Sequence, residues 1–246
     1  MKVYRLVPIV FLTLFLTTCS KETENLSRST YYVAFEILGD NPVIVQVGEE
    51  YVDAGAIATL QGQDVTDAMV VKSNVNDNAM GMYRVEYSHV NTDGLESRAI
   101  RDVIVCNPNV TADLSGTWNV SEDSYRLVIA SGAETNYGGD DYTVRITRLA
   151  PGFFAVSDFL AGWYTVLNPN VGARVAMSGY FSMNEDNTIN VLSSYIEYWG
   201  VGLDFLNNGI YDPDSEPDVE IIQWEAGFGA ALGSPYGFNV SLTKEK

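Results

Sequence analysis

The segment Gly81-Met82-Tyr83-Arg84-Val85-Glu86-Tyr87 decides the fold class, because apolar and charged side chains alternate from Tyr83 to Tyr87. Successive side chains of a β-strand point to opposite faces of a sheet, so Tyr83, Val85 and Tyr87 share one face of a strand. Similar runs rich in Val, Ile, Tyr and Thr recur along the chain between Gly, Asn and Asp turns, without sustained helical periodicity. The sequence therefore predicts an all-β protein.

A strong interruption divides the strand-rich sequence at Asn107-Pro108-Asn109. Proline flanked by asparagines is typical of a connection between elements. It separates residues 31–107 from residues 113–246, and both pieces have the length of a domain. Residues 19–30 are polar and are expected to form a flexible tether.

The first piece has the features of an immunoglobulin-like β-sandwich. It contains Gly48-x-x-Tyr51-x-Asp53-x-Gly55-Ala56, Asp64-Val65-Thr66, the strand at 81–87 and the turn signal Asp93-Gly94. In this order the motifs resemble the small immunoglobulin-like modules of bacterial surface proteins. The resemblance implies a seven-strand-like sandwich that serves mainly as a spacer.

The second piece predicts a lipocalin-like antiparallel β-barrel over residues 113–246. Its opening Gly116-Thr117-Trp118 resembles the first strand of lipocalin-like barrels, where a tryptophan closes one end. About eight strands in about 130 residues is the count for a small closed barrel. Residues 158–173 and 195–218 do not fit simple hairpins, and we expect them to cover or line the barrel mouth.

The N-terminus predicts export. Lys2 and Arg5 precede an apolar run, Leu6 to Leu16, that is too short to cross a bilayer, so residues 1–18 are interpreted as a signal peptide. Leu16-Thr17-Thr18-Cys19 resembles a bacterial lipobox, although Thr18 departs from the small residue usual there. The resemblance implies lipidation of Cys19; an ordinary cleaved signal is the alternative.

The residues after Cys19 indicate a cellular location. Ser20-Lys21-Glu22-Thr23-Glu24 resembles the acidic stretch that sends Bacteroidetes-type lipoproteins to the outer face of the outer membrane. The alternative is a simple solvated tether, and the two are compatible. We expect a protein held at the outer membrane by its lipid anchor alone and facing the cell exterior.

Composition excludes several functional classes. The chain has 14 basic and 32 acidic residues and a net charge of -18, which argues against nucleic-acid binding. A single histidine, His89, excludes multi-histidine metal sites and leaves one imidazole for nucleophilic catalysis, in the predicted spacer. Cys106 follows an apolar run and is expected to be buried. With no dinucleotide or phosphate-binding motif, we expect neither enzymatic activity nor an organic cofactor.

Further motifs of the second piece match a larger family. They are the stretches Ala150-Pro151-Gly152-Phe153-Phe154-Ala155-Val156-Ser157-Asp158-Phe159, Gly162-Trp163-Tyr164, Gly179-Tyr180-Phe181, Asp186-Asn187-Thr188-Ile189 and Phe238-Asn239-Val240-Ser241-Leu242-Thr243-Lys244. They resemble a family of Bacteroidetes surface lipoproteins with an immunoglobulin-like first domain and a lipocalin-like second domain. Members are commonly encoded beside outer-membrane glycan importers of the starch-utilisation (Sus) type. The resemblance implies an extracellular glycan and an importer as partners, and it supplies no catalytic motif.

Aromatic and polar residues of the two irregular segments are the candidate ligand contacts. Flat aromatic rings cover the apolar face of a sugar, while amides and carboxylates bind its hydroxyls. The candidates are Trp163, Tyr164, Tyr195, Tyr198, Trp199, Asp204 and Asn207. The alternative is that these rings only pack over the barrel end, and for Trp118 and Trp224 a core position is expected.

An acidic run at 212–218 is the one candidate metal site. Asp212, Asp214 and Glu216 alternate along it, and calcium prefers several oxygen ligands. The run lacks the glycine and distal glutamate of an EF-hand, and its two prolines favour a stiff, solvated turn. Both interpretations stay open.

The sequence as a whole favours non-catalytic capture of an extracellular glycan by a cell-surface lipoprotein. One alternative is a barrel that holds a small apolar ligand, which requires a wide, dry interior. Another is a structural accessory that docks onto an outer-membrane importer, for which a large exposed apolar patch is expected.

Overall fold

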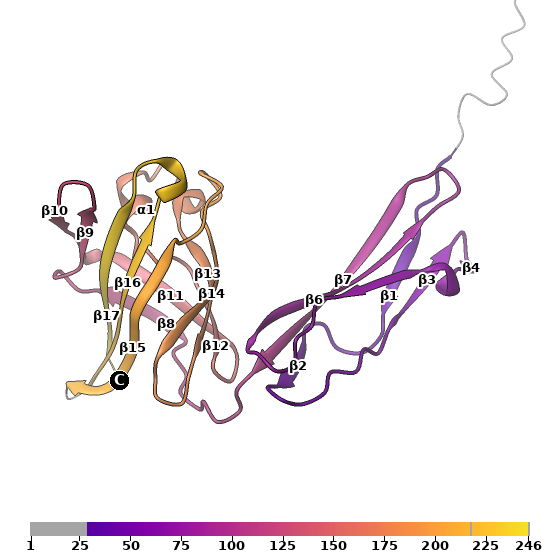
Figure 1. Cartoon of the computed structure of the whole chain (residues 1–246), viewed down its shortest axis with the longest axis horizontal. Helices are drawn as coiled ribbons and strands as arrows, with labels where there is room; N and C mark the ends of the chain where they lie inside the picture. Colours follow the sequence, from indigo (N-terminus) through magenta and orange to yellow (C-terminus); the bar gives the residue numbers. More distant parts are fainter. Residues whose placement is uncertain (1–28, 217, 246) are drawn as a thin grey trace, which may run out of the picture.

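A computed structural model describes residues 29–216 and 218–245, apart from the side chain of Glu216. The signal peptide, Cys19 and most of the tether lie outside the described residues. Two β-rich bodies follow one another along the chain and meet at one end of each (Figure 1). In the described part, no helix has the length and apolar character needed to span a membrane.

The first body consists of two sheets and confirms the predicted immunoglobulin-like fold. A three-stranded sheet has the order β1-β3-β4, and a four-stranded sheet has the order β2-β7-β6-β5. The strands are β1 (Ala34–Ile37), β2 (Val43–Gln46), β3 (Ala56–Leu60), β4 (Gln63–Asp64), β5 (Val70–Ser73), β6 (Gly81–Val90) and β7 (Glu96–Cys106), with the 3-10 turn η1 (Thr66–Ala68) before β5. Strand β2 pairs with β7 in parallel, and the other pairs are antiparallel.

The alternation at 81–87 places side chains as predicted. Val85 and Tyr87 are buried in the core between the sheets. The turn from β6 to β7 is stabilised by Asn91, whose Oδ1 accepts hydrogen bonds from the backbone N–H groups of Asp93 and Leu95 at 3.0 and 2.8 Å. Gly94 occupies the left-handed region of that turn with φ 81°.

The motif around Asp53 has a physical role in this domain, because its carboxylate neutralises a buried arginine. Arg101, which is 1% exposed, forms an ion pair with Asp53 at 3.0 Å and donates to the Gly55 carbonyl oxygen at 2.9 Å. The Tyr51 and Tyr87 hydroxyl groups donate to the same carboxylate at 2.9 and 2.7 Å. Because a buried charge is costly without partners, this network explains why the motif needs these residue types.

The second body is a sheet that curls into a barrel. Its strands are β8 (Gly116–Val120), β9 (Tyr125–Val128), β10 (Ala133–Asn136), β11 (Gly139–Ala150), β12 (Phe153–Val156), β13 (Ser178–Met183), β14 (Ile189–Tyr195), β15 (Phe205–Glu216), β16 (Val219–Phe228) and β17 (Tyr236–Glu245). The order is β10-β9-β17-β8-β11-β12-β13-β14, and β17 also pairs with β16, which pairs with β15. At one end, β14 and β15 are joined by the Thr188–Ile210 bridge and by a 3.0 Å bond from Tyr211 N–H to the Asn187 carbonyl.

Large side chains fill the interior of this barrel. Trp118 and Trp224 are buried, as predicted, and their indole N–H groups donate to the carbonyl oxygens of Leu114 and Phe159, both at 2.8 Å. Phe154, Phe181, Ile222, Val240 and Leu242 pack in the same cluster. The interior is therefore a packed core, as in other small barrels.

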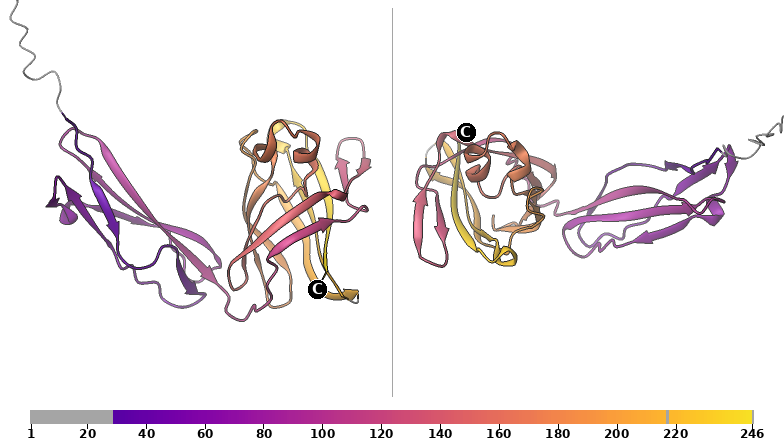
Figure 2. Two further views of the ribbon diagram at one scale, coloured as in Figure 1. Left: turned by 180° about the vertical axis from the view of Figure 1, so that it is seen from behind. Right: turned by 90° about the horizontal axis from the view of Figure 1, so that it is seen from above.

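One end of the barrel is closed by a cap. The cap comprises α1 (Trp163–Leu167), the 3-10 turns η2 (Gly172–Val175) and η3 (Ala230–Leu232), and the loop 196–204. It lies at the end away from the first domain, and the right-hand view of Figure 2 looks down on it. Residues 158–173 are therefore largely irregular, as expected.

The prediction that residues 195–218 are irregular throughout was wrong. Only residues 196–204 form a loop, because 205–216 form the long strand β15 that pairs with β16. The strand tolerates Asn207-Asn208-Gly209 through a register shift between Asn207 and Ile210, with Asn208 at φ 53°. Such a bulge inserts a residue without ending the strand, so turn-like composition was misleading here.

A small apolar cluster joins the two domains. Ile104 and Cys106 at the end of β7 pack with Ala150 and Phe153 of the barrel. Next to this cluster, Asn109 donates a side-chain hydrogen bond to Glu185 at 2.8 Å. Cys106 is 1% exposed, which agrees with its predicted structural role.

Candidate functional site

Three of the predicted ligand contacts are cap rings that pack against the barrel core. The Tyr164 ring meets the Trp199 ring edge-on at 4.9 Å, and the Trp163 ring lies 6.5 Å from the Phe238 ring. Trp163, Tyr164 and Trp199 are half-buried and pack against the barrel core. These rings therefore contribute first to closing the barrel end, although part of each remains accessible.

An arginine is inserted among the cap rings. The Arg126 guanidinium carbon lies 3.8 Å from the centre of the Tyr236 ring and 5.4 Å from that of Trp163. Burial raises the pKa of Tyr164, and the nearby Arg126 charge acts in the opposite direction. Cation–π contacts of this kind stabilise the cap and occupy ring faces that a sugar would otherwise cover.

Tyr195 and Tyr198 are the exposed aromatic members of the predicted set, at 54% and 53%. Tyr198 lies in the cap loop, with its ring edge-on to Trp199 at 5.6 Å. Tyr195 is the last residue of β14 and pairs with Ser178 of β13. Both rings are available on the outer surface.

Asp204 ends the cap loop, Asn207 lies near the start of β15, and the two differ in role. The Asp204 carboxylate accepts a hydrogen bond from the Ala230 backbone N–H at 2.9 Å and so holds η3 against the barrel. Asn207 is exposed on the outer face of the barrel. There it joins residues from three other strands that the sequence analysis had not selected.

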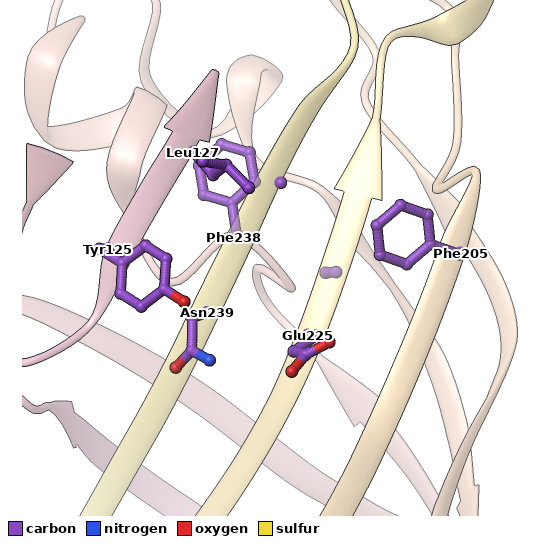
Figure 3. Close-up of a pocket in the computed structure, with 8 residues that line it drawn as sticks. Tyr125, Leu127, Phe205, Glu225, Phe238 and Asn239 are labelled. Atoms are coloured by element: carbon purple, nitrogen blue, oxygen red, sulfur yellow. The ribbon is translucent and has the colours of Figure 1, made fainter. Parts of the chain in front are cut away.

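A groove on the outer face of the barrel is lined by residues of β9, β15, β16 and β17 (Figure 3), and the strand pairing arranges the outward residues of these strands in two rows. Residues paired directly across antiparallel strands share a face of the sheet. The first row is Phe205, Gly227, Gly237 and Leu127, and the second row is Asn207, Glu225, Asn239 and Tyr125, taken from β15, β16, β17 and β9 in turn. We call this arrangement the ladder groove.

Glycines form the floor of the ladder groove. A Cβ atom at Gly227 would lie 2.2 Å from the Phe205 ring, so the ring rests directly on the backbone of β16. At Gly237 the nearest atoms to such a Cβ belong to Leu127, at 3.6 Å. The Phe205 ring takes the place of a side chain at Gly227, and beside it, at Gly237, a cavity of about 180 Å³ lies between Phe205 on one side and Tyr125 and Leu127 on the other (Figure 3).

The second row supplies polar groups along the edge of this cavity. Glu225 and Asn207 are exposed, and Asn239 and Tyr125 are half-buried. Asn208 and Gln223 continue the polar surface in an adjoining depression that shares Glu225 and Asn239. The ladder groove thus combines aromatic walls with amide and carboxylate groups, the combination that recognises a neutral sugar.

A signal for this groove was present in the sequence but spread over distant segments. In Gln223-Trp224-Glu225-Ala226-Gly227 and Gly237-Phe238-Asn239, the core residues Trp224, Ala226 and Phe238 alternate with glycines and with the polar residues Glu225 and Asn239. Glycines at outward strand positions suggest a close approach by a ligand or another chain. The register that aligns them could not be read from either segment alone.

The acidic run lies far from the cap, at the turn between β15 and β16 near the C-terminus (Figure 1). The Asp212 carboxylate accepts a hydrogen bond from the Asp214 backbone N–H at 3.0 Å. Among the residues that the structure describes, no three acidic, histidine or cysteine side chains are placed to hold a metal ion. The Glu216 side chain lies outside that set, so calcium binding stays a prediction.

Comparisons with known proteins agree with the two-domain fold. Residues 107–244 match a family model for a C-terminal domain, and residues 35–105 match the bacterial surface protein Ig-like domain. The crystal structure of lipoprotein BT2262 from Bacteroides thetaiotaomicron is 30% identical to this chain, covering 87% of this chain and 100% of the other, with a TM-score of 0.46. The chain belongs to the BT2262 family of Bacteroides surface lipoproteins. This result confirms the resemblance inferred from the sequence, and it fits a surface location.

Two more distant structures are also similar. One is a multidomain protein including DUF1735 from Bacteroides ovatus, 13% identical over 65% of this chain and 57% of the other, with a TM-score of 0.30. Another contains CBM51-2 in complex with GlcNAc and INT domains from Clostridium perfringens ZmpB, 18% identical over 50% and 31%, with a TM-score of 0.27. Both similarities are too low to support a conclusion about the function of this chain. No curated protein matches the chain.

Proposed function

We propose that the barrel captures a neutral extracellular glycan, without catalysis, at the ladder groove. The observation that carries the proposal is the alignment of Phe205 and Tyr125 with Glu225, Asn207 and Asn239 over a glycine floor. A sugar ring placed on Phe205 would bury its apolar face, and its hydroxyl groups would reach the polar row.

The electrostatics favour a neutral ligand over an acidic one. The chain carries a net charge of -18, and Glu225 is the charged residue among those that line the ladder groove. An anionic glycan would meet like charge both locally and over the whole surface, which disfavours its association. A neutral glycan avoids this repulsion, and a carboxylate can accept hydrogen bonds from its hydroxyls.

The acidic content of the groove supports binding without hydrolysis. Glycoside hydrolysis generally requires two carboxyl groups on opposite sides of the scissile bond. Of the eight residues lining the groove, Glu225 alone is acidic. His89 lies on β6 of the first domain and does not line this groove.

The proposed location is the outer membrane, with the lipid at Cys19 and the barrel facing the cell exterior. The lipobox-like sequence, membership in a lipoprotein family and the surface-type Ig-like domain support it. In this arrangement the first domain is a spacer that holds the ladder groove away from the membrane. An outer-membrane importer as the recipient of the glycan is part of the same proposal.

The packed interior makes the outer face the better place for a ligand. A small apolar ligand would need space where Trp118, Trp224 and Phe154 are buried. Displacing such residues would cost several kcal/mol each. The ladder groove requires no such displacement.

Affinity electrophoresis tests the proposal. The mature chain is run in native gels containing soluble neutral polysaccharides, namely starch, xylan, galactomannan and mixed-linkage glucan. We expect retardation by at least one of them and, for Phe205→Ala, binding about twofold to tenfold weaker, because an aromatic contact contributes about 0.5–1.5 kcal/mol. Glu225→Gln should also weaken binding.

A matched control is Tyr32→Ala, which removes an exposed aromatic ring, 64% exposed, from the first domain. It should leave retardation unchanged. Trp163→Ala and Trp199→Ala test whether the accessible parts of the cap rings contribute. Retardation that is lost in these cap variants but retained in Phe205→Ala would move the site from the ladder groove to the cap.

A further inference from the structure

A second groove lies on the neighbouring outer surface of the barrel. Its floor is made of small residues, Ala155 of β12, Ser178 of β13 and Ser193 of β14, and it has a volume of about 320 Å³. Tyr180 and Tyr195 form its aromatic walls. We call it the tyrosine groove.

Packing beneath the tyrosine groove fixes its shape. The Tyr180 ring stacks on Phe153, with ring centres 5.7 Å apart and an angle of 29° between planes. Gly179 cannot be replaced without disturbing the sheet, since a Cβ there would lie 2.0 Å from the Ser193 carbonyl oxygen. The groove therefore exists before any ligand binds, which lowers the entropic cost of binding.

The cap loop brings the two grooves together. Tyr195 ends β14 in the tyrosine groove, and Phe205 begins β15 in the ladder groove. The loop between them folds back, because the Leu203 backbone N–H donates to Ser194 Oγ at 2.8 Å and the Ile196 N–H donates to the Val201 carbonyl at 2.7 Å. With consecutive Cα atoms about 3.8 Å apart, this contact keeps Phe205 within about 18 Å of Tyr195.

An exposed ring lies on the loop that separates the grooves. Tyr198 is 53% exposed, and its backbone N–H donates to the Arg174 carbonyl at 2.9 Å, which holds this part of the loop to the cap. Tyr195, Tyr198 and Phe205 thus place accessible rings in the tyrosine groove, on the loop and in the ladder groove. The residues lining the tyrosine groove carry no ionisable acid or base of Asp, Glu, Lys, Arg or His type.

We propose that one polymer chain occupies both grooves, so that the ligand is an extended neutral glycan rather than a single terminal sugar. The inference rests on the proposed function of the ladder groove and specifies its ligand class. Two shallow grooves that each bind weakly become effective when one chain engages both, since the second contact is then intramolecular. This explains how a surface with no deep pocket among its described cavities could retain a polysaccharide.

The length of the oligosaccharide is the variable that tests this inference. Oligosaccharides of increasing length are prepared from whichever polysaccharide retards the mature chain, and their affinities are measured by calorimetry. We expect affinity to rise roughly tenfold or more once an oligosaccharide spans both grooves. Tyr195→Ala should remove this increase while leaving the affinity for the shortest bound oligosaccharide unchanged.

Further variants separate the two grooves. Phe205→Ala should weaken binding at every length, and Ser193→Arg, which fills the tyrosine groove at an exposed position, should reproduce the effect of Tyr195→Ala without removing an aromatic ring. The Tyr32→Ala control should match the parent chain. Agreement between the two tyrosine-groove variants excludes misfolding of one of them as the cause.

The outcomes distinguish this inference from the proposed function. Binding that does not change with length, or that is unaffected by both Tyr195→Ala and Ser193→Arg, would overturn the polymer inference and leave ladder-groove binding intact. Failure of the parent chain to bind any polysaccharide of the panel would overturn both.

Discussion

Replacing Asp158 by asparagine should change how the stability of the barrel depends on pH. Asp158 is 4% exposed, between β12 and the cap, and its carboxylate accepts backbone hydrogen bonds from Leu160 at 2.9 Å, Met177 at 3.0 Å and Gly162 at 3.1 Å. Burial raises its pKa from 3.8 to about 6, although the three hydrogen bonds act in the opposite direction. Desolvation therefore outweighs them.

The direction of the effect follows from proton binding. Between pH 4 and pH 6 the folded state holds a proton on Asp158 that the unfolded state has lost, so the free energy of unfolding falls as pH rises through this window. A difference of about two pKa units between the folded and unfolded states changes the free energy of unfolding by about 3 kcal/mol in total. About 2 kcal/mol of this change occurs between pH 4 and pH 7. Asparagine cannot titrate, so Asp158→Asn removes this contribution.

The assay is urea denaturation at several pH values, followed by tryptophan fluorescence. All four tryptophans (Trp118, Trp163, Trp199 and Trp224) belong to the barrel, so the signal reports on that domain. The parent chain should gain about 2 kcal/mol relative to Asp158→Asn when the pH is lowered from 7 to 4.

A second acidic residue provides the control. Hydrogen bonds from the Thr188 side chain and backbone N–H lower the pKa of Asp186, so its contribution is present above pH 4 and is lost only below its ordinary pKa. The difference between the parent chain and Asp186→Asn should therefore be nearly flat from pH 4 to pH 7. The stability difference between the parent chain and Asp158→Asn could instead also be flat, or grow with pH. The hydrogen bonds to Asp158 would then outweigh its desolvation, and the predicted pH dependence would be refuted.

Two further predictions concern the first domain and the joint. Asp53→Ala should destabilise the first domain by about 3–5 kcal/mol, because it leaves Arg101 buried without its carboxylate; thermal unfolding followed by far-UV circular dichroism measures this, and unchanged tryptophan fluorescence would show that the barrel stays folded. Burial raises the pKa of the Cys106 thiol, so a thiol reagent should label it slowly in the native chain. Phe153→Ala, which opens the same apolar cluster, should speed labelling at least several-fold, whereas equal rates would show that the cluster does not protect the thiol.

The candidate site could be predicted only in part from the sequence. Aromatic content and predicted irregularity drew attention to Trp163, Tyr164 and Trp199, yet these rings pack into the cap because the barrel end needs apolar cover. Asn207 was selected for its place in a supposed loop, and it reaches the ladder groove from a strand instead. Tyr125 and Asn239 were not selected, since neither is unusual in its own segment.

What the sequence determined by itself was local in origin. Side-chain alternation with a period of two is a property of neighbouring residues, so Tyr83, Val85 and Tyr87 could be assigned to one face of a strand, and the all-β class followed. Short motifs likewise indicated the immunoglobulin-like domain, through their resemblance to the modules of bacterial surface proteins.

The tertiary structure decided which of these strands lie side by side, and in what register. The ladder groove aligns residues from β9, β15, β16 and β17, some of them more than 100 positions apart in sequence. A shift of one residue in any pair would turn its outward side chains into the core, and that choice is set by packing over the whole barrel rather than within a strand. The site is therefore a property of strand register, which no single segment of this sequence contains.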